Sequence, residues 1–226
     1  MTIAYSIGKR LYLNITNRCP NDCVFCIRQN GDGIGDTQLW LEAEPDVDQI
    51  LQSVGDPGGY EEIVFCGYGE PIMRLDIIVA VAKALRPFGI PIRLDTNGLA
   101  DLIHGRDVWP DLAGLLDAVS ISLNAHNAAE YDRLCRTQWG AEAYQAMLNF
   151  TNRAKDYVPK VMLTVVDYPG VNLEACRNIA DEIGVSFRIR HYEAPPSAAA
   201  MHRGAGAAAQ RAAAEGQRAV AEGHKQ

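Results

Sequence analysis

The sequence predicts an α/β fold in which a curved, mostly parallel sheet forms a partial (β/α)6 barrel. Strand-like and helix-like segments alternate along most of the 226 residues, which is the pattern of strands joined by crossover helices. The alternation gives six such pairs, too few for the eight of a closed barrel. Polar side chains also recur on one face of the strands, which indicates a cavity rather than a sheet covered on both faces.

Six segments have strand character because they are rich in β-branched or aromatic residues and are bounded by turn formers. They are 11–17, 62–68, 91–97, 118–124, 160–167 and 185–192. A shorter strand near 3–6 precedes them, and Gly8-Lys9 is placed to turn it into a hairpin with the first.

Helices are predicted between the strands. Pro45 suits the first position of a helix whose apolar residues recur at helical spacing up to Val54. Asn127 with Glu130 is typical of a capping pair, and Asn172 is expected to cap the last helix. Three further helices are predicted over 75–86, 109–116 and 141–156.

The strand alternation predicts the two faces of the sheet. One parity is apolar, as in Val119, Ile121 and Leu123, and should face the helices. The other parity is largely polar: Asn14, Thr16, Cys66, Arg93, Asp95, Asn97, Ser120, Ser122, Asn124, Thr164, Arg188 and Arg190. A solvent-facing sheet surface is the alternative, but the repetition over several strands favours a polar cavity near the carboxyl ends of the strands.

Composition and charge exclude several classes of function. The net charge of −7 is no electrostatic footprint for nucleic acid. No apolar segment suits a signal peptide or a membrane span, so we expect a cytoplasmic protein with reduced thiols. Residues 1–193 are predicted as one domain, and 194–226, rich in Ala and Gly, as a flexible or marginally helical tail.

Cys19, Cys23 and Cys26 follow the first strand with the spacing C-x3-C-x2-C. A [4Fe–4S] cluster normally takes four cysteines, so three leave one iron open, as a catalytic metal site requires. Structural zinc would need a second Cys/His pair, and the nearest histidine is His104. A disulfide would suit a secreted protein. The spacing therefore predicts a reactive iron–sulfur cluster. The other cysteines, Cys66, Cys135 and Cys176, are expected to be packed thiols.

Three further motifs follow the later strands in order. They are Gly67-Tyr-Gly-Glu-Pro71, Asp95-Thr-Asn-Gly98 and Ser120-Ile-Ser-Leu-Asn124. Together with the cysteine motif they resemble the radical S-adenosylmethionine (SAM) superfamily, over about residues 3–193. More narrowly, the runs TNRCPNDCVFC and VDYPGVN resemble the radical SAM family linked to TatD-type nucleases.

The resemblance implies a fold, cofactors and a mechanism. The open iron of a [4Fe–4S] cluster binds SAM, and one electron cleaves SAM to methionine and a 5′-deoxyadenosyl radical that abstracts a substrate hydrogen. A reductant such as flavodoxin or ferredoxin is implied as a partner. A functional link to a TatD-type metal-dependent hydrolase is implied by the closer resemblance.

The resemblance also assigns residues. Cys19, Cys23 and Cys26 match the cluster ligands, and Phe25 matches the aromatic position that meets the adenine. The remaining SAM positions are matched by Gly67, Gly69, Glu70, Thr96, Asn97, Ser122 and Asn124. Gly67, Gly69 and Glu70 match a GGE motif whose backbone carbonyls hold the SAM amino group, although Tyr68-Gly69 replaces the usual pair of glycines. For Asn97 and Ser122, an ordinary turn and an ordinary strand residue are the alternatives.

Arg93, Arg188 and Arg190 share the polar parity. Guanidinium forks pair with carboxylate or phosphate, so we expect one to serve the SAM carboxylate and the others an anionic substrate. An internal ion pair with Asp95 or Glu70 is the alternative.

The leading interpretation is a radical SAM enzyme that acts on an unidentified substrate. Within the superfamily, a glycyl-radical activase and a deazapurine synthase are alternatives, and they would need a docking surface and a magnesium site near the cluster, respectively. A non-enzymatic electron-transfer or metal-binding module is the alternative from another class, and it predicts no binding of SAM.

Overall fold

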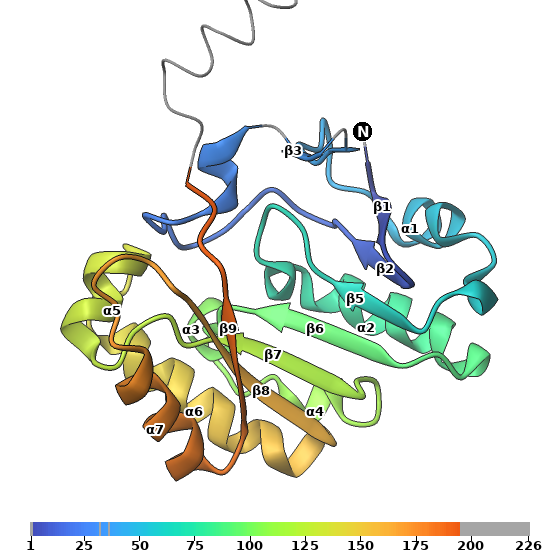
Figure 1. The fold of residues 1–226 in the computed structure, drawn as a ribbon. Coiled ribbons are helices and arrows are strands. Elements are labelled where there is room, and N and C mark those ends of the chain that lie inside the picture. The colour runs from blue at the N-terminus through green and yellow to red at the C-terminus, as the bar shows by residue number, and fades with distance from the viewer. Residues whose placement is uncertain (1, 32, 36, 195–226) are drawn as a thin grey trace, which may run out of the picture. The chain divides into compact units, whose positions relative to one another are not determined.

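The computed structural model describes residues 2–31, 33–35 and 37–194. Its main sheet has seven strands in the order β1-β2-β5-β6-β7-β8-β9 (Figure 1). They are β1 (Ala4–Ile7), β2 (Arg10–Leu13), β5 (Glu62–Phe65), β6 (Ile92–Thr96), β7 (Ala118–Ser122), β8 (Lys160–Val166) and β9 (Ser186–Arg190). β1 is antiparallel to β2, and every other neighbouring pair is parallel. The predicted curved parallel sheet and its leading hairpin are confirmed, whereas the predicted tail lies outside the described residues from 195 onward.

Seven α-helices occur in the described part of the chain. They are α1 (Val47–Val54), α2 (Leu75–Leu85), α3 (Ala100–His104), α4 (Trp109–Leu112), α5 (Ala128–Cys135), α6 (Glu142–Tyr157) and α7 (Leu173–Ile183). As predicted, Asn127 and Asn172 cap α5 and α7: their Oδ1 atoms accept hydrogen bonds from the amides of Glu130 and Ala175. Across the described residues, no helix combines the length and apolar character that a bilayer crossing demands.

Two local predictions are wrong. Pro45 does not begin α1: Asp46 caps the helix, and its carboxylate and the Gln49 side chain each accept the other residue's amide at 2.8 and 3.0 Å. This reciprocal capping box outweighs the preference for proline at a helix start. The helix expected over 109–116 ends at Leu112, and α3 precedes it without a strong sequence signal. The segment after the cysteines also forms a small hairpin of β3 (Gly33–Ile34) and β4 (Thr37–Gln38).

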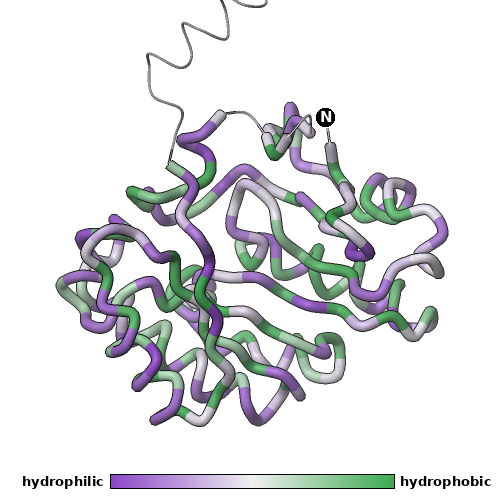
Figure 2. Tube along the Cα trace, in the orientation of Figure 1, coloured by the Kyte–Doolittle hydropathy of each residue, from purple (hydrophilic) through white to green (hydrophobic). Residues whose placement is uncertain are grey.

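The apolar parity of the strands makes the core, as predicted. Leu13, Phe65, Leu94 and Ile121 are fully buried in the core beneath the helices that cover this face of the sheet in Figure 1. Figure 2 shows the same division along the chain, with hydrophobic stretches in the sheet and hydrophilic ones on the outer turns of the helices. Since these helices cover one face, the polar parity of the strands is left to line the other.

The loops after β2 and β5 pack backbone against backbone. The amides of Gly69 and Glu70 donate to the carbonyls of Thr16 and Arg18 at 2.9 and 2.8 Å. A Cβ on Gly69 would lie 2.4 Å from the Thr16 carbonyl oxygen, and one on Gly67 would lie 2.0 Å from Asn14 Oδ1. Both glycines are therefore required by the protein's own close packing.

We expect Gly69→Ala to lower the free energy of unfolding by about 1–3 kcal/mol, because the added methyl must push two stretches of backbone apart. Gly59→Ala is the matched control, since a Cβ there would meet nothing within 4 Å, and its effect should stay within about 0.5 kcal/mol. Urea unfolding measures both. Equal losses in the two variants would contradict close loop packing as the reason for Gly69.

Candidate functional site

A cavity of about 380 Å³ lies on the polar face of the sheet, within the size range of small-molecule sites. Nearly every predicted site residue lines it: Cys19, Cys23, Phe25, Cys26, Gly67, Gly69, Glu70, Thr96, Asn97, Ser122, Asn124, Arg188 and Arg190. Arg93 is not part of this wall. The structure thus brings together side chains from the loop after the first predicted strand to the last predicted strand.

The cysteine loop is fixed on two sides. Its start is held by the loop after β5, through the amides of Gly69 and Glu70. Its middle is bonded to the end of α5, since the amides of Asp22 and Val24 donate to the carbonyls of Cys135 and Leu134 at 3.1 and 2.9 Å. These two bonds flank Cys23, so α5 determines where this thiol lies.

All three thiols of the motif are partly buried and reduced. Burial raises the pKa of the Cys19 thiol to about 12, and a hydrogen bond with Cys135, followed by burial, raises the pKa of Cys23 well above its usual value. Such thiols keep their protons until a metal displaces them.

Within the described ranges, no three His, Cys, Asp or Glu side chains converge as ligands of one metal ion. A [4Fe–4S] cluster does not require this, because its cysteines bind different irons. The donor set fits a cluster held by three thiolates.

Phe25 begins a row of aromatic rings at the edge of the cavity. Its ring centroid is 5.9 Å from that of Tyr168, which in turn is 4.9 Å from Tyr192. Asp167 holds the far end, because its carboxylate accepts from the Tyr192 amide at 2.5 Å and contacts His191 at 2.8 Å. Tyr168 and Tyr192 are not among the residues predicted from the sequence. The position of Tyr168, directly after a predicted strand, is the signal that would have found it.

Glu70 is buried and accepts three hydrogen bonds. The donors are the Thr96 hydroxyl and the Asn97 amide, both at 2.7 Å, and the Ile72 amide at 3.2 Å. Burial raises the pKa of Glu70 to about 7, although these donors favour the ionised form. The side chain therefore joins the loop after β5 to the end of β6, and the Thr96 hydroxyl, predicted as a SAM contact, is bonded to Glu70.

Asn97 and Asn124 leave polar atoms without partners beside the cavity. In the described part of the chain, Asn97 Nδ2 and Asn124 Oδ1 are buried and form no hydrogen bond. The side-chain oxygen Oδ1 of Asn97 already accepts from the Leu99 amide at 3.0 Å. An unsatisfied buried amide is costly, so one donor and one acceptor remain for a polar ligand. This fits a bound nucleoside-type cofactor at the ends of β6 and β7.

The three predicted arginines differ in their partners. Arg93 is buried and forms ion pairs with Asp95 at 2.6 Å and Glu62 at 3.2 Å, which is the internal ion pair expected as the alternative to a ligand contact. Arg190 donates to Ser122 Oγ at 3.2 Å, so this predicted SAM contact is tied to β9. Arg188 and Arg190 form no ion pair among the residues described.

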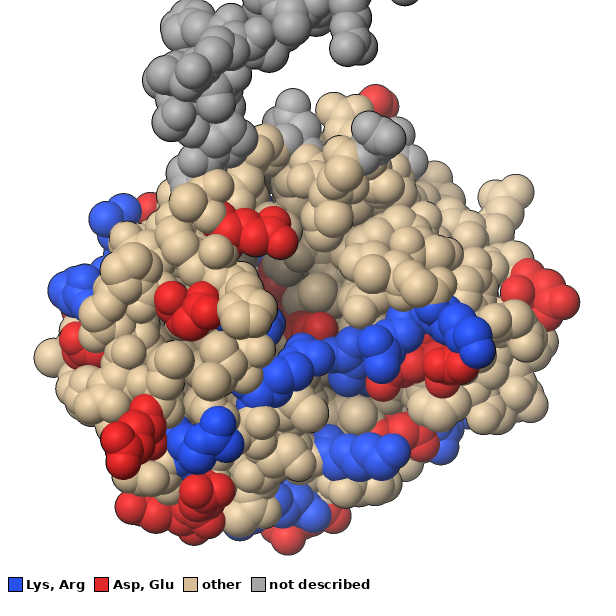
Figure 3. All heavy atoms as spheres, in the orientation of Figure 1, with Lys and Arg blue, Asp and Glu red and all other residues tan. Residues whose placement is uncertain are grey.

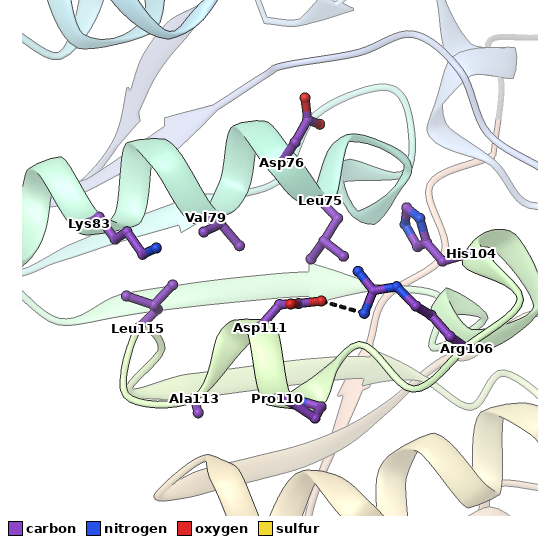
Figure 4. Close-up of a pocket in the computed structure, with 10 residues that line it drawn as sticks. All are labelled: Leu75, Asp76, Val79, Lys83, His104, Arg106, Pro110, Asp111, Ala113 and Leu115. Atoms are coloured by element: carbon purple, nitrogen blue, oxygen red, sulfur yellow. Dashed lines mark ion pairs between the residues drawn. The ribbon is translucent and has the colours of Figure 1, made fainter.

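A second groove, of about 710 Å³, lies on the helix side of the sheet (Figure 4). It lies between α2 and the segment from His104 to Leu115, and the ion pair between Arg106 and Asp111, at 2.5 Å, joins two residues of that segment along one wall. No cysteine of the motif and no residue of the loop after β5 lines this groove. The candidate site is therefore the cavity on the polar face.

Comparison with known proteins gives matches over most of the chain. Residues 13–183 match the model of the radical SAM superfamily. A GTP 3′,8-cyclase of Lactiplantibacillus plantarum is 27% identical over 161 residues, which are 71% of this chain and 46% of the relative. A probable GTP 3′,8-cyclase of Halobacterium salinarum is 31% identical over 189 residues, which are 80% and 49%. The chain thus spans about half the length of these curated relatives.

Among solved structures, SuiB of Streptococcus suis resembles the chain in fold, with a TM-score of 0.61 and 15% identity over 85% of this chain and 41% of that one. The fold, the cavity with its three cysteines and the match over residues 13–183 all indicate the same superfamily. The chain belongs to the radical SAM superfamily and is an enzyme of that type, with a [4Fe–4S] cluster and SAM as its cofactors.

Proposed function

We propose that the chain cleaves SAM reductively and uses the resulting radical to abstract a hydrogen from an organic substrate held in the same cavity. One observation carries the proposal: the cysteine motif, Phe25, the loop after β5 and the ends of β6 and β7 all line one cavity. The alternative of a non-enzymatic electron-transfer module finds no support, because that cavity holds open donors and acceptors that such a module does not need.

The proposed roles follow from position. Cys19, Cys23 and Cys26 hold the cluster, which with bound SAM supplies the homolytic C–S cleavage. The backbone of Gly67 and Gly69 faces the cavity and is kept in place by the loop after β2. Phe25, Asn97 and Asn124 offer a ring, a donor and an acceptor for the nucleoside half of SAM. The chain's own contribution is to orient both cofactors and to exclude water.

The first test is formation of 5′-deoxyadenosine. Protein purified without oxygen, reconstituted with iron and sulfide, and reduced with dithionite should form it from SAM. Cys23→Ala should reduce the yield to background, because one cluster ligand is lost. Cys176→Ala is the control, since Cys176 is buried on α7 and does not line the cavity, and it should keep the wild-type yield.

The proposal is wrong if wild-type protein with a complete cluster forms no 5′-deoxyadenosine and its electron paramagnetic resonance signal does not change when SAM is added. The same experiment with flavodoxin or ferredoxin in place of dithionite tests the proposed reductant.

A second candidate function is chemistry on GTP. The observation in its favour is that curated relatives sharing 27% and 31% identity are named GTP 3′,8-cyclase and probable GTP 3′,8-cyclase. These relatives favour a family other than the TatD-linked one. The resemblance to the TatD-linked family rests on the cysteine run and the VDYPGVN stretch. A glycyl-radical activase and a deazapurine synthase stay as further proposals within the superfamily.

We expect the GTP candidate to show SAM-dependent consumption of GTP by the reduced, reconstituted protein, followed by chromatography. ATP is the matched control nucleotide. Formation of 5′-deoxyadenosine at the same rate with and without GTP, and no loss of GTP, would exclude this candidate while leaving SAM cleavage intact.

A further inference from the structure

A row of charged side chains crosses the polar face of the sheet from β2 to β6. Arg10 pairs with Glu62 at 3.1 Å, Glu62 with Arg93 at 3.2 Å, and Arg93 with Asp95 at 2.6 Å. The register places these side chains on one face. Arg10 is opposite Glu62, and Val64, two residues after Glu62, is opposite Arg93. Asp95 follows Arg93 by two residues and so points to the same side. Within this row, each charge has an opposite charge beside it.

Two more arginines lie on the same face on β9, which is separated from β6 by β7 and β8. Arg188 is opposite Thr164 and Arg190 is opposite Val166 in the β8–β9 register. Since they are two residues apart on one strand, both side chains lie on the cavity face, and both line the cavity. β9 is the last strand of the sheet, so in the described structure no further strand supplies them with partners.

Among the residues described, the two arginines of β9 form no ion pair, whereas Arg10 and Arg93 are paired with Glu62 and Asp95. Asp95 already contacts Arg93. The other carboxylates in the cavity wall are Glu70, which is bonded to β6, and Glu193, and neither forms an ion pair with an arginine among the residues described. Figure 3 shows Lys and Arg side chains along the rim of the hollow in this face, with Asp and Glu side chains beside them and within the hollow.

In the described structure the Arg190 guanidinium has no charged hydrogen-bond partner. The guanidinium donates a hydrogen bond to the neutral Ser122 hydroxyl, which brings no compensating charge. An anion placed between the two β9 arginines would supply an opposite charge to both.

We propose that Arg188 and Arg190 form an anion subsite for the substrate, which is a small molecule carrying a phosphate or carboxylate group. The proposal deepens the proposed function and rests on it. Guanidinium groups bind both anions through paired hydrogen bonds. The net charge of −7 disfavours a nucleic acid chain as the substrate, which favours a small anionic molecule over that macromolecule.

The test measures binding of two probes, inorganic pyrophosphate and citrate, by calorimetry on the full, reconstituted chain with SAM present. We expect one probe to bind saturably, and which one binds distinguishes phosphate from carboxylate. Arg188→Gln and Arg190→Gln should each weaken that binding by roughly ten- to a hundredfold, the effect of losing a hydrogen bond between charged groups. Arg188→Lys and Arg190→Lys keep the charge but lose the fork, and they should fall between wild type and the Gln variants.

Arg10→Gln is the matched control, because Arg10 lies on the same face but is paired with Glu62 and does not line the cavity. Its probe affinity should stay within twofold of wild type. The proposal is overturned by no saturable binding of either probe, by an equal loss in Arg10→Gln, or by β9 variants that lose affinity for SAM instead of the probe. Probe binding in a chain that forms no 5′-deoxyadenosine would keep the anion subsite and reject the proposed function.

Discussion

The buried carboxylate of Glu70 is the interaction on which the geometry of the site depends. Through Thr96 and Asn97 it fixes the loop after β5 to the end of β6, while its own amide donates to the carbonyl of Arg18 in the cysteine loop. One residue therefore joins the segment that carries the thiols, the glycine loop and the strand end that carries Asn97. A carboxylate is suited to this position because it accepts several amide and hydroxyl hydrogens at once, and burial protects those bonds from competition with water.

The two glycines before Glu70 follow from the same constraint. A motif of this kind suggests that glycine lets a ligand approach the backbone, but here the space beside Gly67 and Gly69 is already filled by Asn14 and by the backbone of the cysteine loop. Tyr68 stands where the superfamily motif has glycine. It is accommodated because its side chain points away from the packed loops after β2 and β5. Its ring packs edge-on against Trp40, and its hydroxyl donates to the Gly31 carbonyl at 2.8 Å. The departure from the motif thus holds the hairpin segment after the cysteines beside the cavity.

The sequence is sufficient for features that depend on local geometry and insufficient for those that depend on distant partners. The faces of Ser120, Ile121 and Ser122 are predictable because successive residues of a strand point to opposite sides.

Asn14 and Thr16 have the parity of the cavity but do not line it. Asn14 binds the Leu39 carbonyl and the Tyr68 amide, and the Thr16 hydroxyl binds Glu44 at 2.5 Å. These partners lie 25 to 54 residues away, so no pattern near Asn14 or Thr16 reveals them. Arg93 is placed on the correct face by its parity, and its capture by Glu62 and Asp95 is visible only when neighbouring strands are aligned.

The net charge of the whole chain and the charges of Arg188 and Arg190 act over different ranges. A net charge of −7 at the surface is screened beyond about 8–10 Å at physiological ionic strength, so it neither attracts an anion from afar nor prevents one from entering. At hydrogen-bond distance, well inside this range, two opposite charges attract each other more strongly. Discrimination between anionic and neutral molecules therefore depends on the wall itself, where Arg188 and Arg190 form no ion pair among the residues described. Because Arg93 is neutralised by two carboxylates while the β9 pair is not, the wall favours an anion near the open edge of the sheet over one near its centre.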